Sequence, residues 1–476
     1  MGQEITLEHF TGADFDRFHH RLHLETDLLK QSLNQKRCSM HAPTAGFEIE
    51  AWLIDDKLQP AAINDQYLAS FNHPLAFPEL AKFNVEFNCV PIALTGNVFS
   101  QLHNQLQSIW QAAAQQAKQL NSHLVMIGVL PTLKQSDLHL GNMSNLNRYR
   151  ALNEQISRSR GKPIHIDIVG HEHLKFDHHD VMLESATTSL QTHIQLPLAR
   201  AHHFYNASIL SSAAMVAVCA NSPFVFEKWL WQESRIPMFE QAIETGGYGG
   251  IAQGPLNRVS FGSGYAKKSI MECFDENLTF FPVLLPSLLS EEASAFEHLR
   301  LHNGTIWRWN RPLVGFDDDG MPHIRIEHRT PAAGPTVLDS IANMAFYYGL
   351  SQNICEEIIQ HGAFFDFSWA KDNFYQAARH GLDAHILWKD GQKHTVRHLV
   401  LTELLPRARA GLATLNVDVD DSALYLDVIE QRVSRNQNGS QWQSRFIQRH
   451  RDFSALTETY LQHQDAGQPV SEWPLY

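Results

Sequence analysis

The sequence has few cysteines, and none of them form a close pair. Its five cysteines are scattered over 476 residues without a Cys-x-x-Cys spacing. A disulfide framework needs paired cysteines and a typical zinc site needs closely spaced ones, so neither is expected. Basic residues are also in deficit, with 38 Lys and Arg against 51 Asp and Glu. Because nucleic acids and anionic membranes attract basic surfaces, we expect neither as a partner.

Long apolar runs are missing as well. The longest of them, such as 213–220, are too short to cross a bilayer, and the first ten residues lack the pattern of a signal peptide. We therefore expect a cytoplasmic protein, with a homodimer as a possible assembly. The sequence contains neither a G-x-S-x-G motif nor a P-loop, which argues against an acyl-enzyme hydrolase and a Walker-type nucleotide site.

The chain is predicted to have three parts. Residues 1–45 form an N-terminal helical segment, 46–400 a catalytic domain, and 401–476 a helical extension packed on that domain. Apolar residues at three- and four-residue intervals predict helices over 15–33, 97–121, 201–220 and 334–363. The glycine-rich stretch 246–254 is interpreted as a loop that could act as a lid over the active site.

Four short segments alternate polar and apolar residues, as strands with one polar face do. The polar rows are Glu48 and Glu50, Glu86 and Asn88, His193 and Gln195, and Arg325, Glu327 and Arg329. An ordinary surface strand would explain any one of them. Together they place carboxylates side by side, which is favourable only with cations between them. Mg²⁺ or Mn²⁺ fits oxygen ligands, and the arginines beside Glu327 suit nucleotide phosphates.

These segments resemble, in this order, the glutamate–cysteine ligase type 2 family of carboxylate–amine ligases. The matching stretches are GFEIEAWLID, PELAKFNVEFN, TTSLQTHIQLP, CANSPF and IRIEHRTPAAGPTVLDSIANMAFYYGL. The resemblance implies an α+β fold like that of glutamine synthetase and guanidino kinases, in which a curved antiparallel β-sheet with a polar concave face packs against helices. It also implies ATP as cosubstrate and two or three Mg²⁺ or Mn²⁺ ions.

Matching positions give the implied roles. The metal ligands would be Glu48, Glu50, Glu86, His193 and Glu327, with Glu79 as a weaker candidate. Arg329 would bind phosphate, with Arg235 and Glu327 as further catalytic residues. Arg258, Arg311 and Arg325 would hold the nucleotide. In this chain Asn88 stands where another acid is possible, and 126–131 lacks the histidine of a Gly-Thr-His-Pro turn. These departures leave the amine substrate open.

Other signals have simpler explanations. The segment 170–180 is rich in His and acidic residues, but we favour a polar loop bordering the substrate pocket over a metal site. Asp317 to Gly320 is interpreted as a hairpin turn rather than a calcium loop. Arg148 and Arg150 could reach a substrate carboxylate or pair with surface acids, and the sequence does not decide between these roles.

Three other functions compete with a ligase. A guanidino kinase-like phosphotransferase would use the same phosphoryl chemistry but release a phosphorylated amine. Glycoside hydrolysis by Glu48 and Glu327 leaves the Arg–Glu–Arg row without a purpose. A non-catalytic, nucleotide-binding regulator has little need of so many clustered charges. The ligase interpretation accounts for most of the polar residues.

Overall fold

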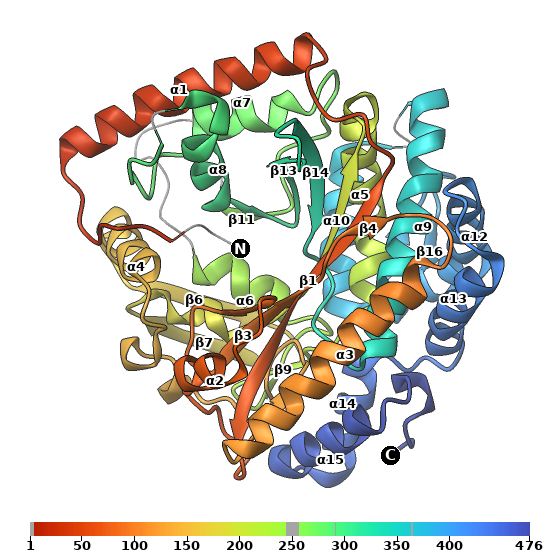
Figure 1. Ribbon diagram of the computed structural model, residues 1–476. Coiled ribbons are helices and arrows are strands. Elements are labelled where there is room, and N and C mark those ends of the chain that lie inside the picture. Colours follow the sequence, from red (N-terminus) through yellow and green to blue (C-terminus); the bar gives the residue numbers. More distant parts are fainter. Residues whose placement is uncertain (1–3, 244–256, 291, 363–364) are drawn as a thin grey trace.

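A computed structural model describes residues 4–243, 257–290, 292–362 and 365–476 of the protein. The proposed glycine-rich lid lies outside these residues. The centre of the fold is an eight-stranded antiparallel sheet with the strand order β13-β14-β8-β1-β3-β2, in which β4 and β5 pair with opposite ends of the long strand β1 (Figure 1). Its strands are β1 (Thr44–Asp55), β2 (Ala76–Pro78), β3 (Asn84–Asn88), β4 (Ile92–Ala93), β5 (Ser122–Val125), β8 (Leu190–Leu196), β13 (Asn310–Phe316) and β14 (Pro322–His328).

The convex face of the sheet is apolar. Its side chains include Phe47, Ile49, Ala51, Val85, Phe87, Ile194 and Ile326, all 3% exposed or less. Three long helices pack behind this face and form the core with it: α3 (Val98–Gln119), α5 (Leu198–Val218) and α9 (Val337–His361). Each fully buried aliphatic side chain contributes about 1.5–3 kcal/mol, so this face fixes the register of every strand in the sheet.

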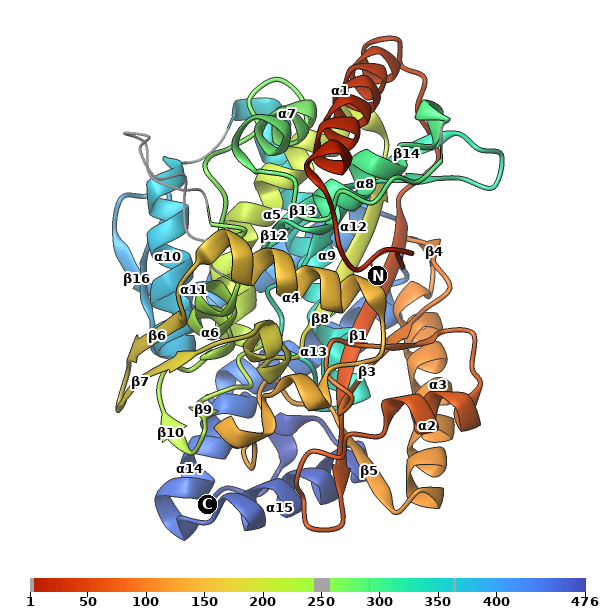
Figure 2. The same ribbon diagram turned by 90° about the vertical axis from the view of Figure 1, so that its left-hand side faces the viewer.

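The concave face is covered by shorter elements, which Figures 1 and 2 place on the side of the sheet away from α9. They are α1 (Gly12–Asn34), α4 (Asn147–Arg160), the 3-10 turn η3 (Val181–Ala186), α6 (Arg235–Ala242), α7 (Met271–Phe280) and α8 (Glu297–Gly304). Smaller elements are α2 (Asn64–Phe71) and the strand pairs β6–β7 (Ile164–Val169, His173–His178), β9–β10 (Phe224–Val225, Lys228–Trp229), β11–β12 (Val259–Ser260, Trp307–Arg308) and β15–β16 (His385–Leu387, Lys393–Thr395).

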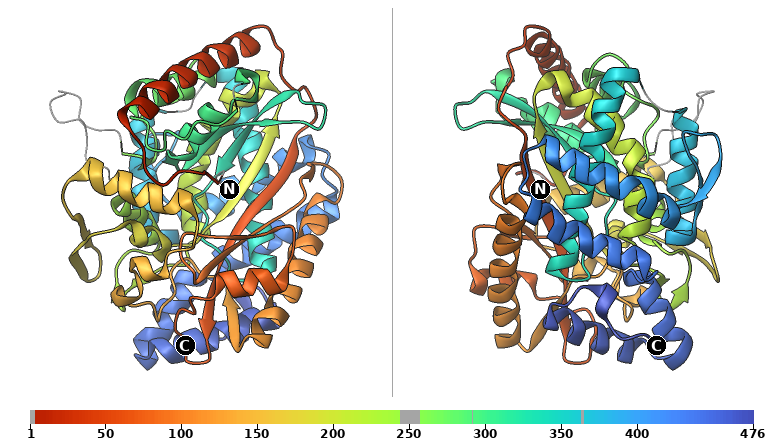
Figure 3. Two further views of the ribbon diagram at one scale, coloured as in Figure 1. Left: turned by 60° about the vertical axis from the view of Figure 1, so that its left-hand side comes forward. Right: turned by 90° about the vertical axis from the view of Figure 1, so that its right-hand side faces the viewer.

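The C-terminal part is helical, and its helices α12 and α13 pack on α9 (Figure 3, right). These elements are α10 (Phe367–His380), α11 (Val396–Leu399), α12 (Leu405–Thr414), α13 (Val419–Ser434), α14 (Gly439–His450) and α15 (Phe453–Ala466). A π-helical turn over Val400–Leu404 joins α11 to α12, so the predicted boundary after residue 400 falls inside a continuous helical run. The three-part division stays a prediction. No helix among the described residues is long and apolar enough to cross a membrane.

Candidate active site

Strand register brings the predicted polar residues together on the concave face. The opposed pairs are Glu50–Glu86 and Glu48–Asn88 between β1 and β3, Glu48–Gln191 between β1 and β8, His193–Glu327 between β8 and β14, and Glu327–Arg311 between β14 and β13. Directly opposed residues lie about 5 Å apart and share a face. The separate polar segments of the sequence therefore form one continuous surface.

This surface forms one wall of a cavity of about 510 Å³. Seven glutamates and five arginines line it: Glu48, Glu50, Glu79, Glu86, Glu184, Glu297 and Glu327, with Arg148, Arg300, Arg311, Arg325 and Arg329. The wall thus carries both signs of charge with carboxylates in excess. Such a wall can bind cations and phosphate groups in one space.

Glu327 is the centre of the charged network. Its Oε2 accepts a hydrogen bond from Arg311 Nη2 at 3.0 Å, and its Oε1 accepts one from Arg329 Nη1 at 2.6 Å. Arg329 Nη1 also donates to Gln191 Oε1 at 2.6 Å. Burial opposes ionisation of Glu327, but the charges of Arg311 and Arg329 outweigh it and hold its pKa well below the usual range. The carboxylate is therefore ionised and fixes both guanidinium groups in the cavity wall.

Glu50 on β1 and Glu86 on β3 are short of positive charge. Glu50 accepts hydrogen bonds from the Ser189 amide at 2.7 Å and from Gln191 Nε2 at 2.9 Å. Burial, reinforced by the charge of Glu79, nevertheless raises the pKa of Glu50 to about 7. Glu86 is 2% exposed, its Oε1 has no hydrogen-bond partner, and burial together with the charge of Glu48 raises its pKa well above the usual range. These carboxylates would be stabilised by a cation.

His193 lies beside the acids but not in the cavity lining. Its Nε2 is 3.6 Å from Glu48 Oε1 and has no hydrogen-bond partner. Burial lowers the pKa of His193 to about 4, so the imidazole is neutral at physiological pH. A neutral imidazole with a free nitrogen can bind a metal ion. Tyr348 of α9 donates a hydrogen bond to the His193 carbonyl oxygen at 2.7 Å and so ties this part of β8 to the core.

The acidic row fits a divalent cation, although the side chains alone do not complete a site. Within the described ranges, no group of three or more His, Cys, Asp or Glu residues is arranged so that it could hold a metal ion by itself. Mg²⁺ needs no such group, because it is commonly held by one or two carboxylates together with substrate phosphates and water. The unpartnered oxygen of Glu86 and the oxygen-rich wall favour such shared binding.

Arg325 and Arg300 form the cationic end of the cavity. Neither has an ion pair among the residues that the structure describes, and Arg325 Nε has no hydrogen-bond partner. Partial burial and the positive charge of Arg325 lower the pKa of Arg300, against the opposing charge of Glu297. Two neighbouring cations without a carboxylate partner favour a multiply charged anion such as a polyphosphate.

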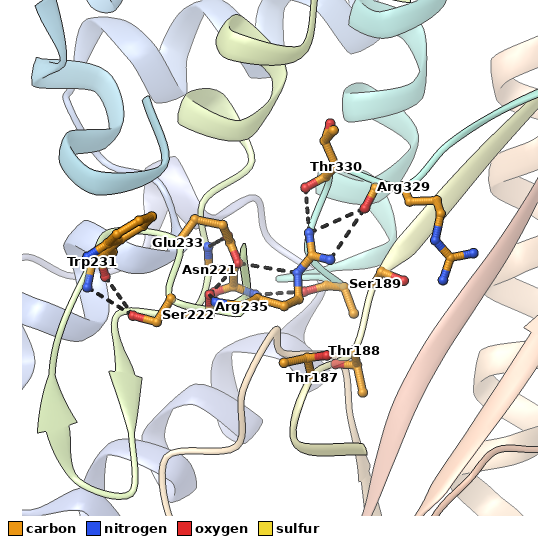
Figure 4. A network of polar contacts seen from close by, with 12 residues as sticks. Thr187, Thr188, Ser189, Asn221, Ser222, Trp231, Glu233, Arg235, Arg329 and Thr330 are labelled. Carbon is orange, nitrogen blue, oxygen red and sulfur yellow. Dashed lines mark hydrogen bonds and ion pairs between the residues drawn. The ribbon is translucent and has the colours of Figure 1, made fainter. Parts of the chain in front are cut away.

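Two predicted arginines lie outside the cavity lining. Arg235 is 2% exposed and donates to the carbonyl oxygens of Arg329 and Thr330, while its Nε lies 3.3 Å from Glu233 Oε1. Figure 4 shows its guanidinium directed at this backbone and the side chain of Arg329 extending away from it. Arg258 is bound in the same way, to the carbonyl oxygens of Thr305 and Pro282. In this geometry both arginines support the cavity wall rather than reach into it.

The two arginines that the sequence left open differ in position. Arg148 lines the cavity, and its Nη2 donates to Tyr149 OH at 2.7 Å. Arg150 instead pairs with Glu8 at 2.6 Å on the surface. Glu184 and Arg300, which also line the cavity, were not predicted from the sequence, because they lie on η3 and α8, outside the alternating strands.

The His-rich segment 170–180 is not part of the cavity lining, and most of it forms the exposed β6–β7 hairpin. His173 Nε2 lies 2.8 Å from Asp167, and His165 Nδ1 lies 2.7 Å from Asp177. The prediction that this segment borders the pocket was wrong. Cross-strand pairing occupies His173 and Asp177 on the surface.

Comparisons with known proteins identify the fold and the family of the chain. The chain resembles the glutamate–cysteine ligase of Francisella tularensis, solved in complex with AMP, with a TM-score of 0.57 and 11% identity over 92% of this chain and 91% of that one. A bifunctional glutathione synthetase from Pasteurella multocida gives a TM-score of 0.46 and 11% identity, over 93% of this chain and 55% of that one. No curated protein sequence matches. The model of glutamate–cysteine ligase family 2 matches residues 44–468, and the chain belongs to this family of ATP-dependent carbon–nitrogen ligases.

Proposed function

We propose that this protein uses ATP and Mg²⁺ to join the carboxylate of glutamate, or of a glutamate-like acid, to an amine. One observation carries the proposal. The Arg311–Glu327–Arg329 network and the acidic row of β1 and β3 line the same cavity. Phosphoryl transfer needs chiefly positioning and neutralisation of charge, and this wall supplies groups of both signs.

The proposed reaction has two steps. The donor carboxylate takes the γ-phosphoryl group of ATP, which gives an acyl phosphate and ADP. The amine nitrogen then attacks the carbonyl carbon, phosphate leaves with the bonding electron pair, and the nitrogen loses a proton. Arg329 and Arg311 would face the transferred group, because Glu327 orients both. Arg325 and Arg300 would hold the remaining phosphates of the nucleotide.

Glu48, Glu50, Glu86, His193 and Glu327, with Glu79 beside them, would hold two or three Mg²⁺ or Mn²⁺ ions together with the substrate phosphates. The ions would neutralise charge on the phosphates during transfer. Arg235 would keep Arg329 in place through its backbone, and Arg258 would do the same for Thr305, which lines the cavity. Cytoplasmic location and a homodimer remain predictions.

The test is ADP release from ATP and Mg²⁺, with glutamate fixed, a panel of amines varied, and products identified by mass. Cysteine comes first because the family is named for it. We expect ADP release that requires both glutamate and one amine, with a product equal to their sum minus water. A phosphorylated amine without condensation would instead indicate a guanidino kinase-like phosphotransferase. If ATP stays intact across the panel, the proposal fails for glutamate as donor.

A further inference from the structure

The helix α8 supplies Arg300 to the cavity wall and is held at both of its ends. At its C-terminal end, Asn303 Nδ2 donates a hydrogen bond to the Pro312 carbonyl oxygen of β13 at 2.9 Å. Its N-terminal end follows Phe296, whose side chain cannot accept a hydrogen bond from the first amides of the helix. The acceptor for these amides must therefore come from another part of the chain.

Glu25 of α1 is that acceptor. Its side chain is fully buried, and α1 packs on α8 (Figures 1 and 2). Glu25 Oε2 accepts a hydrogen bond from the amide of Leu299, the third residue of α8, at 2.8 Å. In most helices the side chain of the residue before the helix caps an amide at this position. Glu25 therefore caps α8 from a different helix.

A histidine completes the contact between the two helices. His298 is 1% exposed, and its Nδ1 lies 2.6 Å from Glu25 Oε1. Its Nε2 lies 3.2 Å from the amide nitrogen of Leu289, which can only donate. Because Nε2 accepts this hydrogen bond, the ring proton is on Nδ1 and is donated to Glu25. Both carboxylate oxygens of Glu25 are thus occupied by the first turn of α8.

The capped turn leads directly to Arg300. The Arg300 amide donates to the Phe296 carbonyl oxygen at 2.9 Å and so closes the first turn of α8. The direction in which a side chain leaves a helix is set by the backbone of that turn. The guanidinium of Arg300 lies over the ring of Phe316, 5.9 Å from its centre, a contact that leaves its N–H groups available to a ligand.

We propose that Glu25 is a positioning residue for nucleotide binding, because it caps α8 and thereby directs Arg300 toward the phosphates. The proposal rests on the function proposed above, in which Arg300 holds phosphates of ATP. The family model matches residues 44–468 and leaves α1 outside the match. The N-terminal segment 1–45 thus contributes to the nucleotide site through one buried carboxylate, although it supplies no group that touches the nucleotide.

The test is Glu25→Gln, which keeps the shape of the side chain. A carboxamide has one acceptor oxygen in place of two, so the variant loses the hydrogen bond to either Leu299 or His298. We expect the Kd for ATP, measured by calorimetry with Mg²⁺ and without an amine, to rise about three- to tenfold. Thr26→Val is the matched control and should leave this Kd unchanged. Thr26 is also buried in α1, but its hydroxyl donates to the Leu22 carbonyl oxygen of the same helix at 2.7 Å.

A double-mutant cycle separates positioning from a general loss of stability. In the Arg300→Ala background, Glu25→Gln should not raise the Kd further, because the group through which Glu25 acts is gone. If Glu25→Gln does not fold, Glu25→Asp replaces it in the cycle; this variant keeps the charge but is one methylene shorter, and we expect a smaller rise that is likewise absent in Arg300→Ala.

Three results would overturn the assignment: an unchanged Kd in the Glu25 variant that folds, an unchanged Kd in Arg300→Ala, or additive effects of the two substitutions. Failure of the wild-type protein to bind ATP would instead overturn the proposed function, and this assignment with it.

Discussion

At the scale of single residues, Glu327 is the position where charge matters most, because it holds two arginines at once. In Glu327→Gln we expect turnover to fall at least about 100-fold, since neither guanidinium keeps its ionic partner beside the reacting phosphate. Breaking the buried network should also lower the free energy of unfolding by about 3 kcal/mol. ATP turnover and thermal denaturation measure the two effects separately.

Glu276→Gln is the matched control for that substitution. Glu276 pairs with the buried Arg308 but does not line the cavity. Its loss should cost stability and leave the rate constant of turnover unchanged. Full activity in Glu327→Gln would place the phosphoryl chemistry elsewhere.

Arg325 and Arg300 should act on nucleotide binding. Replacing either with Ala removes one charge from the pair that faces the cavity without a carboxylate partner. We expect the KM for ATP to rise about tenfold, because a charge-assisted contact to phosphate is lost. Steady-state kinetics with varied ATP provide the measurement, and Arg150→Ala, which removes a surface arginine paired with Glu8, is the control. An unchanged KM in both variants would contradict the assignment.

The sequence predicted the strand residues of the cavity but not those from helices and turns. Alternation placed Glu48 and Glu50 on one face of their strand and Glu86 on the polar face of another, because a strand's side chains follow a strict period of two. Arg300 and Glu184 carry no such pattern and reach the cavity only through tertiary packing. For the same reason, sequence could not show that backbone carbonyl oxygens already occupy the guanidinium of Arg235.

At the scale of elements, α9 positions the central strands through one hydroxyl. Tyr348 OH lies 3.1 Å from the carbonyl oxygen of Gly46 on β1 and 2.7 Å from that of His193 on β8, and its one proton is shared between them. In Tyr348→Phe we expect a loss of about 1–3 kcal/mol in unfolding free energy and a weaker Mg²⁺ dependence of turnover, since both strands carry proposed metal ligands. Thermal denaturation and Mg²⁺ titration of activity measure these effects.

Tyr347→Phe is the comparison for Tyr348→Phe. The neighbouring hydroxyl bonds Ser208 of α5 at 2.8 Å and does not contact β1 or β8 through a hydrogen bond. It should cost similar stability and leave the Mg²⁺ dependence intact. The same Mg²⁺ shift in both variants would mean that the effect comes from the core in general.

Helices and turns were predicted well where one local rule governs them. The apolar period over 334–363 corresponds to α9, and Asp317 to Gly320 forms the turn between β13 and β14. The end of the predicted catalytic domain was harder, because residues around 400 continue from α11 into α12 through a π-helical turn. The local sequence does not mark a domain boundary there. Only the packing against α9 shows where the C-terminal helices lie.

At the scale of the whole molecule, buried titratable groups make stability depend on pH in two directions. Burial lowers the pKa values of His193, His302 and His328 to about 4, 4 and 3. Protonation therefore favours the unfolded chain, and stability is lost as the pH falls below about 6.5. Glu327, with its depressed pKa, adds to this loss at lower pH. The acidic side of the stability profile should therefore be steep.

Buried acids lower the stability of the protein as the pH rises. Burial raises the pKa of Glu240 to about 7, although Trp309 Nε1 and Tyr375 OH both donate to its Oε1 at 2.8 Å. Glu50 and Glu184 are raised to about 7 and 8. Their folded-state pKa values exceed the unfolded ones, so the stability they contribute is complete below about pH 4 and is lost as the pH rises through 7 and 8.

The losses of stability at acidic and at alkaline pH together predict that the protein in EDTA has its highest melting temperature at about pH 6. Glu240→Gln keeps an oxygen that can accept both hydrogen bonds, so the variant should gain up to about 3 kcal/mol in unfolding free energy over the wild type at pH 8 and much less at pH 5. Mg²⁺ with ATP should raise the melting temperature more at pH 8 than at pH 6, because metal binding requires ionised carboxylates. Thermal scans from pH 5 to pH 9 measure all three effects. A melting temperature that rises from pH 6 to pH 8 in EDTA would show that the buried acids do not control stability.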